Sequence, residues 1–191
     1  MALGAAATPA RSESPDEASA RAATLRAVAA LALPAVALGP RRLEDAVVRF
    51  ERWRDGFQPV AELDHPYLST DQIQYGPPDP RPAWEAQLDA LELESRQRWE
   101  RGFVDAASTE REELLRLHLA RHLPRGGGES PLPEPARAPH VAIGLMAWFY
   151  STPAANDLCY GRAIRRHTCR GLPSAVEEPP PLAGEPLFTE D

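Results

Sequence analysis

The chain contains no lysine, and all 21 of its basic residues are arginine. These arginines are outnumbered by 28 acidic residues, which gives a formal net charge of -7. A protein that binds nucleic acid generally needs a concentrated basic face to neutralise phosphates. The charge balance therefore argues against a nucleic-acid partner.

Long apolar runs are also missing. No stretch of about 20 consecutive apolar residues is present, so we expect no segment inserted in a bilayer. The best candidate, residues 25–38, contains Arg26 and is interrupted by Pro34. The pair Arg41 and Arg42 follows this run, whereas a twin-arginine export signal would precede it. We expect a cytoplasmic location from this pattern, or a periplasmic one if the chain is exported together with a partner.

Cysteine is scarce, with two residues in the whole chain, Cys159 and Cys169. Their spacing matches neither a Cys-x-x-Cys redox pair nor a four-ligand zinc site. A straight helix would separate them by about 15 Å, whereas a disulfide tolerates a Cα separation of about 4.4–6.8 Å. A turn at Gly161 or after Ile164 would allow a bridge. A disulfide and two separate thiols both stay open.

Signatures of bound cofactors are absent as well. The sequence has no GxGxxG, P-loop or GxSxG motif, and no Cys-x-x-Cys-His for covalent haem. The glycines at 126–128 are flanked by proline and arginine, which is typical of a linker. We therefore expect this chain itself to carry no cofactor.

Composition divides the chain into a middle domain and two ends. Residues 1–20 and 173–191 are poor in large apolar side chains and rich in proline, serine or acids, which predicts disordered tails. Residues 21–172 are expected to form one helical domain, with a flexible linker at about 124–139. Apolar residues recur there at helical spacing, and no alternating strand pattern competes. The sequence predicts an all-α fold of five to six helices, over 16–32, 40–57, 82–105, 108–124, 140–150 and from 151 or 152 onward.

Two parts of this plan carry specific signals. Thr109 and Glu112 have the spacing of a capping box, which predicts the start of the fourth helix. Residues 58–82 hold six prolines and no helical period, which predicts a long irregular loop. Tyr67 and Tyr75 in that loop are expected to anchor it against the helices or a partner.

Two pairs of residues suggest a free-standing chemical site. His118 and His122 lie one helical turn apart, the spacing of helical zinc ligands, but the sequence offers no third ligand. Asp64 and His65 could form an acid–base pair, although Pro66 leaves their geometry unfixed. A helical metal-binding or hydrolytic protein that uses these four residues is the alternative function. Structural histidines on a half-exposed helix face are the simpler interpretation.

The most informative stretch is His140–Tyr150, a nearly unbroken apolar run that is followed by Asp157-Leu158-Cys159-Tyr160-Gly161-Arg162. Consecutive helical side chains point about 100 degrees apart, so Trp148, Phe149 and Tyr150 cannot all face one core. We expect at least one of them to meet a second surface.

These segments, together with others in the same order, resemble the small subunit of flavin-dependent gluconate 2-dehydrogenases, the gluconate 2-dehydrogenase subunit 3 family. The similarity covers about residues 25–173. Its other landmarks are Phe50-Glu51-Arg52-Trp53, Glu62-Leu63-Asp64-His65-Pro66-Tyr67, Gln87-Leu88, Phe103, Arg111, Leu115 and His140-Val141-Ala142.

The resemblance implies a non-catalytic accessory subunit of an oxidoreductase complex. In that family FAD and the substrate are bound by a separate large subunit of the glucose-methanol-choline type, and electrons pass to a cytochrome subunit or another acceptor. The small subunit assists assembly, export and stability of the large one. Many members carry a twin-arginine signal that this chain lacks, which puts the export role in doubt and leaves the assembly role intact.

Interface residues follow from the landmarks and from residue type, because aromatic residues and arginine concentrate at binding hot spots. The arginines from 162 to 170 could equally be a solvated helix end. The expected interface residues are Asp64, His65, Tyr67, Trp148, Tyr160 and Arg162.

Overall fold

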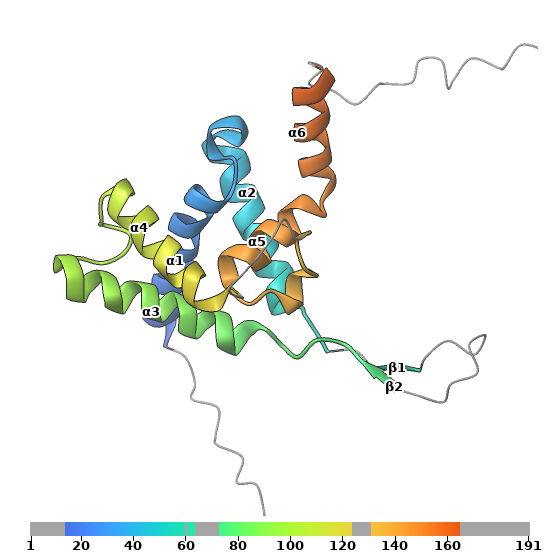
Figure 1. Ribbon diagram of the computed structural model, residues 1–191, viewed down its shortest axis with the longest axis horizontal. Coiled ribbons are helices and arrows are strands. Elements are labelled where there is room, and N and C mark those ends of the chain that lie inside the picture. The colour runs from blue at the N-terminus through green and yellow to red at the C-terminus, as the bar shows by residue number, and fades with distance from the viewer. Residues whose placement is uncertain (1–13, 60, 64–72, 124–130, 165–191) are drawn as a thin grey trace, which may run out of the picture.

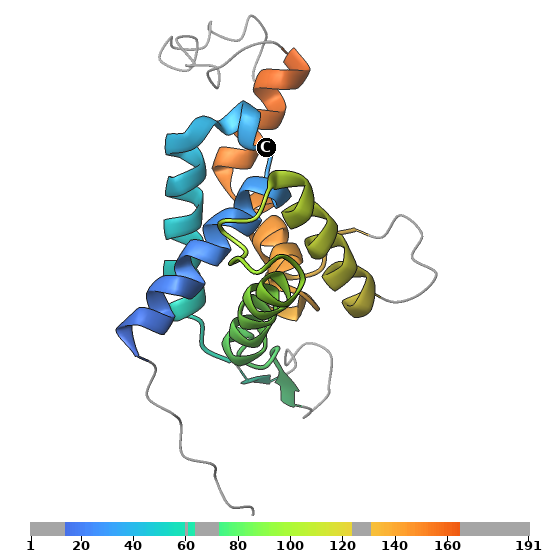
Figure 2. The same ribbon diagram turned by 90° about the vertical axis from the view of Figure 1, so that its left-hand side faces the viewer.

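The computed structural model describes residues 14–59, 61–63, 73–123 and 131–164, and every structural statement below concerns these residues. The predicted all-α class is confirmed, because six α-helices make up most of this part (Figures 1 and 2). The helices are α1 Pro15–Ala32, α2 Ala35–Asp55, α3 Arg81–Trp99, α4 Ser108–His122, α5 Val141–Tyr150 and α6 Pro153–Ile164.

The first helix begins inside the range that composition assigned to a tail. Ser14 Oγ accepts a hydrogen bond from the backbone N–H of Glu17, and the Glu17 carboxylate accepts one from the N–H of Ser14. This capping box, with Pro15 in the first turn, starts α1. For residues 16–20, where the sequence predicted both a tail and the start of a helix, the structure shows the helix. Residues 1–13 lie outside the described part.

The second helix also begins earlier than predicted, at Ala35 instead of Pro40. Gly39 interrupts it with a positive φ of 72°, a conformation that favours glycine. Pro40 lacks a backbone N–H and is therefore tolerated in the first turn of a helix. It begins the straight part of α2, where the sequence predicted the start of the helix. α2 is thus a kinked helix whose kink falls at Gly39 and Pro40.

The third helix ends earlier than its apolar period predicts, at Trp99 instead of residue 105. Glu100 adopts a left-handed conformation with φ 56°, which stops the helix. The chain then folds back, because Ser95 Oγ donates to the carbonyl of Arg101 and the Glu92 carboxylate accepts from the N–H of Phe103. Phe103 is fully buried, and it reaches the core from the loop that follows the helix.

The cap of α4 also differs from the prediction. The capping carboxylate belongs to Glu110, whose Oε2 accepts from the backbone N–H of Ala107 at 2.7 Å. Thr109 lies inside the first turn of the helix. The predicted start of this helix at residue 108 is confirmed, whereas the capping box predicted at Thr109 and Glu112 is wrong by two residues.

α5 lies at the centre of the packing, in contact with α1, α2, α3 and α6. Phe50 of α2 anchors an aromatic cluster beside it, with ring centroids 5.6 Å from Trp84, 5.6 Å from Trp148 and 5.7 Å from Trp53. Phe50 and Trp84 are almost fully buried. These rings join α2, α3 and α5 into one core, since aromatic pairs at such distances add attraction to their apolar burial.

Two elements extend away from this core in Figure 1. One is α6, which packs against α5 near its start. The other is a small antiparallel hairpin that the sequence did not predict, formed by β1 Ala61–Leu63 and β2 Ile73–Tyr75 with Glu62 opposite Gln74. Tyr75 is 73% exposed, so it does not anchor the loop against the helices, and its contact with a partner stays a prediction.

The segment before α5 is only partly the linker that was predicted. Residues 131–139 are described, and they contain a short 3-10 helix, η2, over Pro135–Arg137. Ala136 and Ala138 are buried, which ties this part of the segment to the core. Among the described residues, no helix combines the length and the apolar character that a bilayer crossing requires.

Candidate functional site

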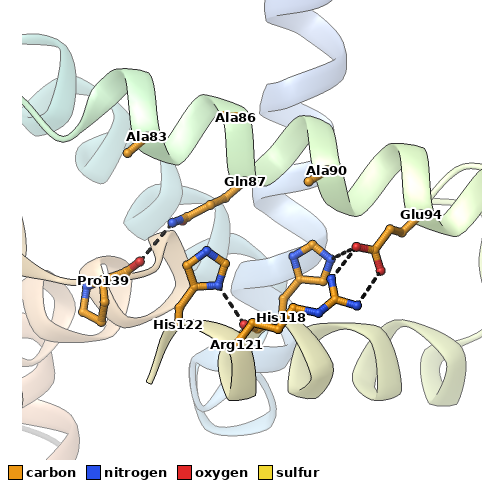
Figure 3. Close-up of a pocket in the computed structure, with 9 residues that line it drawn as sticks. All are labelled: Ala83, Ala86, Gln87, Ala90, Glu94, His118, Arg121, His122 and Pro139. Carbon is orange, nitrogen blue, oxygen red and sulfur yellow. Dashed lines mark hydrogen bonds and ion pairs between the residues drawn. The ribbon is translucent and has the colours of Figure 1, made fainter. Parts of the chain in front are cut away.

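A hollow of about 530 Å³ lies between α3 and α4 (Figure 3). Its α3 wall is formed by residues three, four and seven positions apart, which therefore share one helix face. Three of them are alanines, and these leave the space open beneath the facing side chains of α4. The lining residues are Ala83, Ala86, Gln87, Ala90 and Glu94 of α3, His118, Arg121 and His122 of α4, and Pro139.

Two of the candidate residues from the sequence, His118 and His122, do meet at this hollow. They differ in environment, because His118 is 2% exposed whereas His122 is exposed. His122 Nδ1 donates a hydrogen bond to the backbone carbonyl of His118 at 2.8 Å. The expectation of two half-exposed histidines is therefore wrong for His118.

Glu94 connects this histidine to an ion pair. The Glu94 carboxylate accepts hydrogen bonds from Arg121, and these hold its pKa below the usual range. Its Oε1 also lies 3.2 Å from Nε2 of His118. That approach lacks the direction of a hydrogen bond, so both ring nitrogens of His118 are buried without a hydrogen-bond partner among the described residues. Burial lowers the pKa of His118, although the nearby carboxylate opposes the shift.

A third histidine joins the group from the start of α5. His140 is fully buried, and its ring centroid lies 5.3 Å from that of His122 and 6.3 Å from that of His118. Its Nδ1 accepts a hydrogen bond from the backbone N–H of Ala142 at 3.1 Å, which caps the helix. Burial, followed by the two neighbouring imidazoles, lowers the pKa of His140 to about 4.

Gln87 fixes the position of this cap from α3. Its Nε2 donates to the carbonyl of Pro139 at 2.9 Å, and its Oε1 accepts from the N–H of Val141 at 2.8 Å. One amide side chain thus binds the backbone on both sides of His140. Trp84 adds a weaker contact, a 3.4 Å hydrogen bond from its indole N–H to the carbonyl of Ala138.

For the metal site of the alternative function, the structure bears only on the pair His118 and His122, and the hydrolytic role stays a prediction. Within the described ranges, no group of three or more histidine, cysteine, aspartate or glutamate side chains is placed to hold a metal ion. The carboxylate nearest His118 is engaged by Arg121. The other proposed pair, Asp64 and His65, lies outside the described residues. The described residues therefore support a packing junction at this hollow.

The predicted interface residues fall in three places. Asp64, His65 and Tyr67 lie outside the described part, as does Cys169. Trp148 is half-buried against Phe50, whereas Phe149 is buried and Tyr150 is 41% exposed. The residue of this triplet that meets solvent is thus Tyr150, which the interface prediction did not include.

The remaining candidates lie on α6. Tyr160 and Arg162 belong to this helix, but their side chains are outside the described part. Cys159 is exposed. Because α6 continues through Gly161 to Ile164, a disulfide to Cys169 would require a turn after the helix, and this pairing stays a prediction.

Sequence reasoning missed Gln87, Glu94 and His140 as parts of this junction. Gln87 and Glu94 are seven residues apart on one face of α3, a spacing that could have placed them together. His140 directly precedes the apolar helix, where a capping side chain is expected. Their meeting with α4 is a long-range contact that spacing alone does not predict.

Comparison of the chain with protein-family models, curated proteins and solved structures finds no match.

Proposed function

We propose that this chain is the non-catalytic small subunit of a flavin-dependent sugar dehydrogenase complex, of the gluconate 2-dehydrogenase subunit 3 type. In this role it assists the assembly and stability of a large flavoprotein subunit of the glucose-methanol-choline type. FAD belongs to that partner, and a cytochrome subunit is a further candidate component. The proposal starts from the resemblance in the sequence.

One observation carries the proposal. Landmarks of the resemblance that are far apart in the sequence make direct contacts, since Gln87 hydrogen-bonds Pro139 and Val141 around His140. Other landmarks are buried in the same core, namely Phe50, Leu88, Phe103, Leu115, Val141 and Ala142. Residues recognised only by their order in the chain thus form one packed unit, as expected if they specify a shared fold.

The densest landmark segment lies on α6 and is divided between the core and the surface. Leu158 packs against the core, whereas Asp157 and Cys159 are exposed. α6 also extends beyond the other helices (Figure 1). Such a helix can meet a partner over much of its length while its inner side stays fixed to α5. We place the contact with the large subunit on α6, where Tyr160 and Arg162 are the candidate anchors.

Co-expression tests this role. A candidate partner, a large flavoprotein dehydrogenase of the glucose-methanol-choline type, should give a higher soluble yield and a higher flavin content when this chain is produced with it. Tyr160→Ala and Arg162→Ala should each weaken the complex at least about tenfold, since truncating a central anchor typically costs about 2 kcal/mol or more. Equal yield, flavin content and activity with and without the chain would remove the assembly role.

The isolated chain should contain neither flavin nor stoichiometric metal, and it should oxidise no sugar. This expectation rests on the missing cofactor motifs in the sequence. An absorption spectrum and an elemental analysis of the purified chain are sufficient measurements. A flavin band, or about one zinc per chain, would favour the alternative metal-binding or enzymatic function.

A further inference from the structure

The start of α5 places a buried titratable group at a junction of three helices. His140 caps α5, contacts both histidines of α4 and is enclosed by the backbone segment that Gln87 of α3 holds. It is fully buried. Any change in the charge of this ring therefore acts on α3, α4 and α5 together.

Hydrogen bonding fixes which nitrogen of His140 carries the proton. Nδ1 accepts from the N–H of Ala142 and must be unprotonated. The neutral ring therefore carries its hydrogen on Nε2, which is buried and has no hydrogen-bond partner within the part of the chain that the structure describes. A second proton can enter only at Nδ1. Its arrival converts the cap acceptor into a donor and breaks the hydrogen bond to Ala142.

A positive charge on His140 would find little compensating negative charge in its surroundings. On α4 it faces His118 and His122, which add positive charge if they are protonated. On α3, the carboxylate of Glu94 is engaged by Arg121. Glu134, which precedes η2, is paired with Arg137 of η2. On α1, Arg21 pairs with Asp89 and Arg26 pairs with Glu44 of α2.

We propose that His140, with His118 and His122, forms an acid-sensitive latch between α4 and the start of α5. In its neutral state the latch holds the cap of α5 and the packing of α4 against α3. Protonation of His140 breaks the cap and places a positive charge in a buried space, so the junction opens while the aromatic core around Phe50 remains folded. Acidification is thus a signal that can loosen α4 and the segment before α5 selectively.

The direction follows from proton linkage. The pKa of His140 is lowered from 6.5 to about 4 in the folded state, so the open state binds more protons between these values. The closed junction is fully favoured above pH 6.5 and is lost as the pH falls toward about 4. One such group changes the opening equilibrium by at most about tenfold per pH unit.

The amide of Ala142 gives a direct readout, because its hydrogen bond is made to His140 itself. Hydrogen exchange of the full chain should be measured by NMR and corrected for the intrinsic effect of pH on exchange. Between pH 6.5 and about 5, protection of Ala142 should fall about tenfold relative to the amide of Val28, which lies in the buried part of α1. Protection of the amides in the last turn of α4 should fall over the same pH range as that of Ala142.

His140→Asn is the matched variant, because asparagine is a good helix cap and does not titrate. Protection of Ala142 in this variant should remain in step with that of Val28 over the same pH range. Parallel loss at both amides in the wild type would overturn the latch, as would the same selective loss in His140→Asn.

A measurement on the wild type alone covers the case in which the variant does not fold. The ring of His140 can be titrated by NMR while exchange is followed, and protonation should coincide with the loss of protection at Ala142. Protonation of His140 near its ordinary pKa with Ala142 still protected would contradict the proposal.

Discussion

Gly144→Ala should lower the free energy of unfolding by about 1–3 kcal/mol, the usual cost of overpacking a core. A Cβ at position 144 would lie 2.7 Å from Cη2 of Trp84 and closer still to Cζ2. Trp84 cannot move aside easily, since it is 1% exposed and is stacked against Phe50. In an open helix the same change would stabilise by about 1 kcal/mol, so the sign of the effect tests the close approach of α3 and α5. Urea unfolding of both proteins provides the measurement.

A double-mutant cycle with Trp84→Phe supplies the control. The smaller ring removes the atoms that the new methyl group would meet, so adding Gly144→Ala to Trp84→Phe should cost much less than adding it to the wild type. Equal costs in the two backgrounds would show that the clash with Trp84 is not the cause.

Gln87→Leu should destabilise the protein by about 2–5 kcal/mol, because it leaves two backbone groups without partners. The groups are the carbonyl of Pro139 and the N–H of Val141, which this side chain binds at 2.9 Å and 2.8 Å. Leucine has a similar volume, so the loss comes from hydrogen bonding instead of packing. Thermal or urea unfolding, followed by circular dichroism, measures the change.

Gln97→Leu is the matched control, because it makes the same chemical change on the exposed side of the same helix. Its effect should stay within about 0.5 kcal/mol. Gln87→Glu keeps an acceptor for Val141 and loses the donor to Pro139, so it should fall between the two. A small effect of Gln87→Leu, similar to that of Gln97→Leu, would mean that the start of α5 does not depend on this clamp.

Local sequence signals predicted much of the helical plan. Pro139 and His140 precede an apolar run, and α5 begins there; Pro34 follows the alanine-rich segment, and α1 ends before it. These boundaries depend on residues that are neighbours in the chain. The fold class was predictable for the same reason, since helical periodicity is a local property.

The errors arise where distant residues decide. The apolar period of α3 continues to Phe103, but the chain folds back at Glu100 because Glu92 and Ser95 bind the backbone beyond it. The burial of His118 depends on packing against α3 and α5, and no local pattern reveals it. Gly144 likewise reads in the sequence as a residue that destabilises a helix, and only the structure shows that Trp84 occupies the space beside it.

The candidate site was predictable only in part. Spacing brought His118 and His122 together correctly, but it suggested a metal site that the described residues do not form. The proposed subunit role rests on landmarks whose order was visible in the sequence. The hydrogen bonds of Gln87 to the backbone on both sides of His140 show that landmarks far apart in the sequence contact each other in the fold.

The most direct test of the subunit role is to purify this chain, tagged and co-expressed with a candidate flavoprotein dehydrogenase of the glucose-methanol-choline type, and to measure the mass and flavin absorbance of the eluted species. The proposed role predicts one species that contains both chains in a fixed ratio and carries flavin, and it predicts that α6 variants release the flavoprotein. Elution of this chain alone, with the flavoprotein folded, active and separate, would contradict it.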